Sequence, residues 1–327
     1  MKKKILLFIL LSLSSVNAEE LQLTNISFQT ENDADIRDDA AYSYGGSISA
    51  LFYRKGSQNS FFHIPFTPYA RSNNYFSLRF AHQLYTPENL KDANLIEDDR
   101  PYAGYMYLES GLHQSYKNTL ESLIFSIGVV GPSSKMQSVQ EFIHDLIGSP
   151  YPQGWKYQLK DELTLQLNYS KKLYIEKNNI FHAKKEASFV PEFGFALGNV
   201  STKVYSGVLF RWGENIPKDY GATVIDANSY SHIPLTTKKR ISKKEWSYFL
   251  NLSFKANLIM RNIFLDGNSI QSSHSVEKNI FRADVGYGFS CVYDHFSIDY
   301  LRQHSSKEFT TQESLYSYGS LLFTYHY

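Results

Sequence analysis

A glutamine and a histidine four residues apart, Gln140 and His144, are the side chains of this sequence best suited to chemistry. On a helix, residues i and i+4 lie on one face, so an amide oxygen and an imidazole would stand side by side. An imidazole can take a proton from water near neutral pH, and an amide oxygen can bind a metal ion. The pair therefore predicts a site where His144 is a general base beside a bound metal.

A short helix is the element that must position this pair. The two-residue periodicity of the surrounding sequence stops within residues 132–161, where Ser133 or Ser134 could cap a helix over 136–147. Gly148 would end that helix. The apolar stripe on which it would pack consists of Val139, Ile143 and Ile147.

The rest of the sequence alternates between apolar and polar residues, which is typical of β-strands. It is rich in aromatic residues and holds no run of about 18 apolar residues after the first 18, so a transmembrane helix is not expected. We predict an all-β fold, a transmembrane antiparallel β-barrel of about 12 strands with the short helix over its extracellular rim. The expected strands lie near 21–30, 42–54, 75–86, 103–114, 120–131, 161–175, 187–199, 204–214, 246–265, 279–293, 295–304 and 314–327.

An even number of strands places both chain ends at the periplasmic end of the barrel. The first, third and fifth connections then face outward, and they carry the unusual polar motifs. These motifs are Asn32-Asp33 with Ser43, Asp99-Arg100, and Gln140 with His144. The long stretches 55–74 and 215–245 fall at the periplasmic end, where short turns are expected, and the sequence does not explain them.

The start of the chain resembles an export signal. Lys2, Lys3 and Lys4 precede an apolar run and a small-residue cleavage pattern, so we expect a signal peptide over 1–18 and one barrel domain over 19–327. The formal charge of +1 gives no electrostatic argument for nucleic acid as a partner. A single cysteine excludes an intrachain disulfide, so stability must come from a large core or from a bilayer.

The candidate metal ligands are oxygen atoms. Asp33 would supply a carboxylate, Gln140 an amide oxygen, and the chain around Ser43 a carbonyl. One imidazole and no thiol accompany them, which favours Ca²⁺ over zinc. Arg100 most simply forms an ion pair within its loop, but it could also bind a substrate phosphate through its planar guanidinium.

Three functions are compatible with these residues. No Gly-x-Ser-x-Gly elbow is present, so metal-assisted attack by water is favoured over serine hydrolysis. A calcium-dependent phospholipase would instead need a serine within reach of His144. A passive porin or structural barrel would show an open polar lumen and no metal, with the polar motifs serving only as solvated loops.

The chain resembles the outer-membrane lipid A 3′-O-deacylases over its mature length. The matching motifs are Asn32-Asp33, Tyr42-Ser43-x-Gly45, Gln83-x-Tyr85-Thr-Pro87, Asp99-Arg100, Gly128-Val-Val-Gly-Pro132 and Val139-Gln140…His144-x-x-Ile-Gly148. The resemblance implies a twelve-stranded barrel in the bacterial outer membrane. It also implies a calcium ion and hydrolysis of the ester that holds the 3′-acyloxyacyl chain of lipid A in lipopolysaccharide. We expect the protein to be a monomer.

The resemblance also implies roles for single residues. His144 would be the general base, with Asn32 and Ser43 as further catalytic residues, and Asp33, Gln140 and Ser43 would surround the calcium. Ser43 replaces the family's threonine and keeps a hydroxyl group. Six residues after the histidine, the family's glutamate is replaced by Pro150, which has no side-chain ligand.

Overall fold

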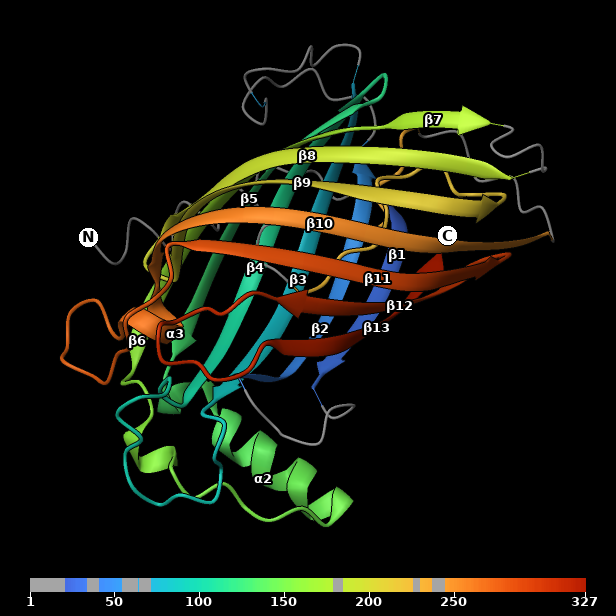
Figure 1. The fold of residues 1–327 in the computed structure, drawn as a ribbon. Helices are drawn as coiled ribbons and strands as arrows, with labels where there is room; N and C mark the ends of the chain where they lie inside the picture. Colours follow the sequence, from blue (N-terminus) through green and yellow to red (C-terminus); the bar gives the residue numbers. More distant parts are fainter. Residues whose placement is uncertain are drawn as a thin grey trace.

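The computed structural model describes residues 21–33, 41–54, 64, 72–178, 185–225, 230–236 and 245–327. These residues form a closed antiparallel β-barrel (Figure 1), which confirms the predicted fold class. The strands are β1 (Leu21–Asn32), β2 (Ala41–Arg54), β3 (Asn73–Thr86), β4 (Ala103–Tyr116), β5 (Thr119–Val130), β6 (Glu162–Leu173), β7 (Ile175–Asn178), β8 (Glu186–Gly198), β9 (Ser201–Glu214), β10 (Trp246–Asn262), β11 (Phe281–Tyr293), β12 (Phe296–Ser305) and β13 (Tyr316–His326). The helices are α2 (Met136–Ile147) and α3 (Ile263–Asp266), with 3₁₀ turns η4 (Pro132–Ser134) and η5 (Trp155–Tyr157).

The wall closes through two pairings between strands that are not consecutive. β1 pairs with β13, and β6 pairs with β8. β7 prolongs β6 beyond Tyr174 and pairs with the same neighbour, so the 13 segments described form a wall of 12 strands. The expected single strand over 161–175 is therefore divided at Tyr174. The predicted signal peptide over 1–18 lies outside the described residues.

The alternation in each strand puts apolar side chains outside and polar ones inside. In β1, Ile26 and Phe28 are exposed on the outer surface, whereas Asn25, Ser27 and Gln29 are buried in the lumen. This inversion of the usual burial pattern is expected of a barrel surrounded by lipid. In the described part of the chain, no helix is long and apolar enough to cross a membrane.

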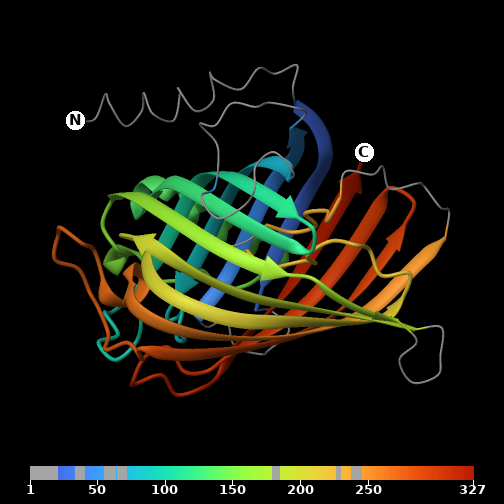
Figure 2. The same cartoon turned by 90° about the horizontal axis from the view of Figure 1, so that it is seen from above.

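The long connection between β9 and β10 folds into the lumen, where Figure 2 shows its gold trace inside the wall. The side chain of Gln29 donates to the carbonyl of Thr223 at 2.8 Å, and the amide of Ile225 donates to Glu31 at 2.6 Å. Tyr220 is fully buried. The described residues of the unexplained stretch 215–245 therefore fill the barrel, and they do not form a periplasmic turn.

Four charged residues anchor this connection to the wall. Arg211 of β9 pairs with Asp219 at 2.6 Å. His232 bonds Asp219 at 3.0 Å and Asp299 of β12 at 2.8 Å. Burial alone lowers the pKa of His232, but the two carboxylates raise it to about 10. The imidazole is therefore held as a cation between two anions.

The second unexplained stretch, 55–74, is described only at Ile64 and from Ser72 onward. Ile64 is buried, and its amide donates to the side chain of Gln114 in β4 at 3.1 Å. At this point the connection between β2 and β3 also contacts the wall. The remainder of the stretch lies outside the described residues.

Candidate functional site

The predicted helix over 136–147 is present as α2, and Gly148 ends it. Gly148 adopts a left-handed conformation with φ 70°, and its amide donates to the carbonyl of His144. At the other end Lys135, with φ 62°, is left-handed and provides no side-chain cap, so the predicted serine cap is wrong. Ser134 instead bonds the carbonyl of Gly131 within the preceding 3₁₀ turn.

The register of the strands shows on which face α2 packs. One row of paired residues crosses four strands near the helix, and we call it the outer row: Asn32, Tyr44, Leu84 and Gly104. Four residues further along each strand lies a second row, the lipid-facing row: Phe28, Ile48, Phe80 and Leu108. All four members of the second row are exposed. Because side chains alternate along a strand, both rows face outward.

The helix covers this outer row. Leu84 forms a buried cluster with Tyr102, Met136 and Trp155, and Tyr44 and Val139 pack at its edge. A Cβ added to Gly104 would lie 2.6 Å from the Cβ of Met136, so glycine permits the close approach of α2. The helix therefore lies against the outer surface of the wall, at the end where β1 finishes and β4 begins (Figure 1). The side chain of Ile147, the last residue of the predicted stripe, is not among those described.

Two of the predicted site residues belong to this surface. Asn32, at the end of β1, is a half-buried member of the outer row. Ser43 occupies a register shift between Tyr42 and Tyr44, where the ladder holds one extra residue. The Ser43 hydroxyl lies 2.5 Å from that of Thr86 and is buried. Asp33 follows Asn32 and is 2% exposed.

The side chains of Gln140 and His144 are both oriented by hydrogen bonds. The indole Nε1 of Trp155 donates to Oε1 of Gln140 at 2.8 Å. Nδ1 of His144 lies 2.7 Å from the carbonyl oxygen of Pro150. A carbonyl can only accept, so Nδ1 carries a proton, and in the neutral imidazole the lone pair is on Nε2. This is the tautomer that a general base acting through Nε2 requires.

A groove of about 590 Å³ adjoins His144. It lies between the end of α2 and two connections, the one between β3 and β4 and the one between β12 and β13. Its lining contains Glu88, Asp98, Asp99 and Glu313. The sequence did not indicate Glu313 as a neighbour of Asp99, because the two loops are more than two hundred residues apart in the chain.

Arg100 lies next to this groove, because it directly follows Asp99, which lines it. It is 1% exposed and forms an ion pair with Glu308, which also binds Arg282 at 2.5 Å. Burial alone raises the pKa of Glu308, but the two guanidinium groups hold it below its usual value. The carboxylate of Asp99 accepts hydrogen bonds from the main-chain amides of Glu88 and Arg100, each at 2.7 Å. The suggested role of Arg100 in binding phosphate stays a prediction, and its observed partner is Glu308.

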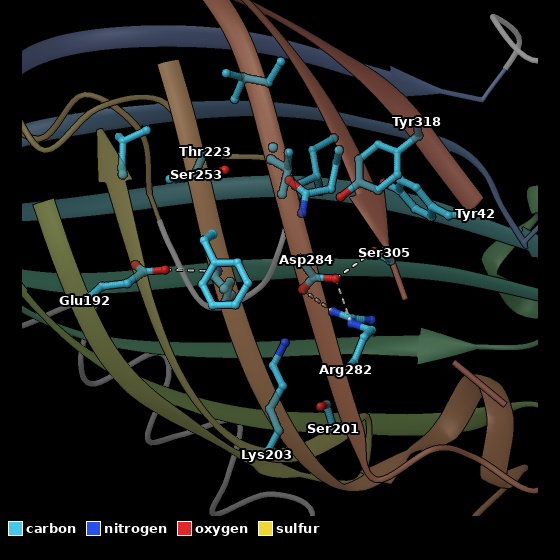
Figure 3. Close-up of a pocket in the computed structure, with 18 of the residues that line it drawn as sticks. Tyr42, Glu192, Ser201, Lys203, Thr223, Ser253, Arg282, Asp284, Ser305 and Tyr318 are labelled. Atoms are coloured by element: carbon cyan, nitrogen blue, oxygen red, sulfur yellow. Dashed lines mark hydrogen bonds and ion pairs between the residues drawn. The ribbon is translucent and has the colours of Figure 1, made fainter. Parts of the chain in front are cut away.

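A second cavity, of about 200 Å³, lies inside the barrel (Figure 3). Arg282 and Asp284 form an ion pair there at 3.1 Å, and Ser305 donates to Asp284 at 2.7 Å. The rings of Tyr42 and Tyr318 meet with their centres 4.8 Å apart. This cavity lies on the lumen side of the wall, whereas α2 lies on the outer side. It is therefore separate from the surface that carries His144.

The metal-binding prediction rests on mixed oxygen ligands. Among the described residues, no three His, Cys, Asp or Glu side chains are arranged to hold a metal. The predicted set combines the carboxylate of Asp33 with the amide oxygen of Gln140 and a carbonyl of the chain around Ser43, and all three residues are nearly buried. Such a set is oxygen-only, and its donor chemistry fits Ca²⁺. The assignment of these ligands stays a prediction.

Comparison with known proteins identifies one family and one close fold. The family model described as “Outer membrane protein LpxR” matches residues 5–327. LpxR from Salmonella typhimurium has a similar structure, with a TM-score of 0.74 and 17% identity, covering 93% of this chain and 100% of that chain. The β domain of the Bordetella autotransporter BrkA gives a TM-score of 0.47 at 8% identity, covering 93% of this chain and 99% of that chain. No curated protein matches the chain.

Proposed function

The chain belongs to the family of the outer membrane protein LpxR, and from this premise we propose that it is a calcium-dependent lipid A 3′-O-deacylase. The protein is a barrel of the bacterial outer membrane. The substrate would be lipid A within lipopolysaccharide, and the bond cleaved would be the ester of the 3′-acyloxyacyl chain.

The position of His144 carries the proposal. Its helix packs on the outer surface of the wall, over the row of Asn32 and Tyr44, and this row lies four residues beyond the exposed lipid-facing row. At about 3.3 Å per residue, the two rows are about 13 Å apart along the strands. An ester near the headgroups of the outer leaflet is at a similar height, so it could reach this surface directly from the membrane.

Residues of this surface would carry out the chemical steps. Nε2 of His144 takes a proton from a water molecule as that water attacks the ester carbonyl carbon. The carbonyl of Pro150 stabilises the imidazolium through Nδ1–H. The same Nε2 then returns the proton to the sugar oxygen that leaves. Asn32, on the same face, would orient the ester through its amide group.

Calcium would be held by Asp33, Gln140 and Ser43. When bound, it would supply stabilisation of the negative charge that develops on the ester oxygen. The bond from Trp155 fixes the amide of Gln140 and leaves Oε1 a second lone pair for a ligand. This arrangement supports the choice of Gln140 as an oxygen donor.

Two observations weigh against the alternatives. A phospholipase mechanism needs a serine activated by a histidine, but the hydroxyl of Ser43, the serine of the proposed site, pairs with Thr86. A passive porin needs an open lumen, but the described part of the connection between β9 and β10 packs inside the barrel. Hydrolysis by an activated water is the reaction that the arrangement supports best.

Mass spectrometry of lipid A tests the proposal. A host that makes a fully acylated lipid A would express the protein, with the His144→Ala variant as a matched control. We expect loss of the mass of the 3′-acyloxyacyl group only with the unaltered protein. An unchanged lipid A spectrum, with the barrel correctly folded in the outer membrane, would refute the proposed activity.

A further inference from the structure

Two large apolar side chains of α2 face neither the wall nor the loops. Phe142 is 67% exposed and Leu146 is 76% exposed. They are one helical turn apart, so they form one continuous apolar strip. Val139, whose position adjoins the strip, packs at the edge of the buried cluster. In water, such a strip would leave apolar surface unburied next to a site that must act at a membrane.

The helix geometry gives the direction of this strip. Phe142 and Leu146 are two residues before and after His144, so each projects about 200° around the helix from it. His144 faces the groove formed by the connections beyond the end of the barrel. Met136 and Gln140 face the wall and Trp155. The remaining flank, with Phe142 and Leu146, is directed away from those connections and back along the outer surface toward the membrane.

The distances place the strip at the edge of the apolar band. A helix with its side chains is about 10 Å wide, and the lipid-facing row lies about 13 Å from the outer row that α2 covers. The strip therefore continues the band of exposed apolar residues that begins with Phe28, Ile48 and Phe80. That band is the surface an outer-membrane barrel presents to acyl chains.

We propose that Phe142 and Leu146 insert among the acyl chains of the outer leaflet and thereby anchor α2 to the membrane surface. The helix would then act as an interfacial helix, with His144 on its aqueous flank and the apolar strip in lipid. The anchor would hold the helix, and the groove beside it, at a constant depth. This inference needs only the outer-membrane location and does not depend on the proposed reaction.

Quenching of tryptophan fluorescence by brominated lipid tests the insertion. Leu146→Trp and Phe142→Trp would each be reconstituted in phosphatidylcholine vesicles that carry bromine in the middle of the acyl chains. Gln137→Trp is the matched control, because Gln137 is exposed on the flank of His144. Subtracting the spectrum of the unaltered protein from that of each variant removes the emission of its 3 native tryptophans.

We expect the emission added at position 146 or 142 to fall at least about twofold in brominated vesicles, whereas that added at position 137 stays nearly constant. Equal quenching at all three positions, or none at positions 142 and 146, would overturn the anchor. Heat-modifiable gel mobility identifies any variant that fails to fold. If either Leu146→Trp or Phe142→Trp fails to fold, the quenching measured with the other one decides whether the strip is in lipid. A failed anchor leaves the lipid A mass spectrum of the unaltered protein unchanged, so the two proposals are tested separately.

Discussion

The Nδ1 atom of His144 lies 2.7 Å from the main-chain carbonyl of Pro150, and this bond determines which nitrogen can act as a base. The acceptor is a backbone atom, so the bond does not depend on the identity of the side chain at position 150. It also closes the segment after α2 back onto the helix. The orientation of the imidazole is therefore fixed by the main chain, although Pro150 has no polar side chain to contribute.

His144→Ala should abolish deacylation without loss of the barrel. The residue lies on a helix outside the wall, so its removal leaves the strand pairings intact. Loss of a general base typically lowers a rate by about 10²–10⁴-fold. Mass spectra of lipid A measure the activity, and heat-modifiable mobility measures the fold. His295→Ala, at the other end of the barrel, should retain activity. A folded His144→Ala variant with the rate of the unaltered protein would exclude His144 as the base.

Glu308→Ala should destabilise the protein strongly. The substitution leaves the buried guanidinium group of Arg100 and the partly buried one of Arg282 without their shared carboxylate. Removing one partner of a buried ion pair costs about 3–5 kcal/mol. The measurement is the midpoint of thermal unfolding in detergent, with Glu313→Ala, an exposed residue of the same loop, as the control. Equal midpoints for the two variants would show that the Glu308 cluster contributes little.

Periodicity explains why the wall and the helix could be predicted. Alternation in each strand and the glycine after residue 147 are local signals, and both agree with the structure. The side of the wall on which α2 packs is not local, because it depends on the register that pairs Tyr44 with Leu84. The ion pair of Arg100 and Glu308 joins residues 208 positions apart. No sequence pattern indicates such a pair, and an ion pair within its own loop was the simplest local interpretation of Arg100.

The position of the connection between β9 and β10 inside the lumen could not be predicted from the sequence for a related reason. The sequence places residues 215–245 at the periplasmic end, where short turns are expected, and does not explain them. Their partners are inward-facing residues of distant strands, such as Gln29, Glu31 and Asp299. A barrel lumen lined with polar groups can bury a polar segment because it supplies hydrogen bonds.

The bonds of His232 to Asp219 and Asp299 should weaken at high pH. The folded-state pKa of His232 is raised to about 10, above the value of about 6.5 expected when unfolded. The stabilisation is therefore complete below about pH 6.5 and is lost as the pH rises through about 10. We expect the difference in unfolding midpoint between the unaltered protein and His232→Asn to shrink between these values. His295→Asn serves as the control. A difference that is constant from pH 6 to pH 10 would contradict a charged imidazole between Asp219 and Asp299.

Chelation should remove the activity, and added Ca²⁺ should restore it, because the proposed ligands are oxygen atoms. Pro150, which has no side-chain ligand and follows the end of α2, allows a sharper measurement. Pro150→Glu keeps the main-chain carbonyl that orients His144 and adds a carboxylate beside the helix end. We expect this variant to reach half-maximal activity at a lower calcium concentration. Pro150→Gln, which adds a neutral side chain of the same length, should have a smaller effect. Full activity of the unaltered protein after verified removal of all metal would contradict the calcium requirement. Identical dependence of activity on calcium concentration in the two Pro150 variants would show that a carboxylate at position 150 does not bind the ion.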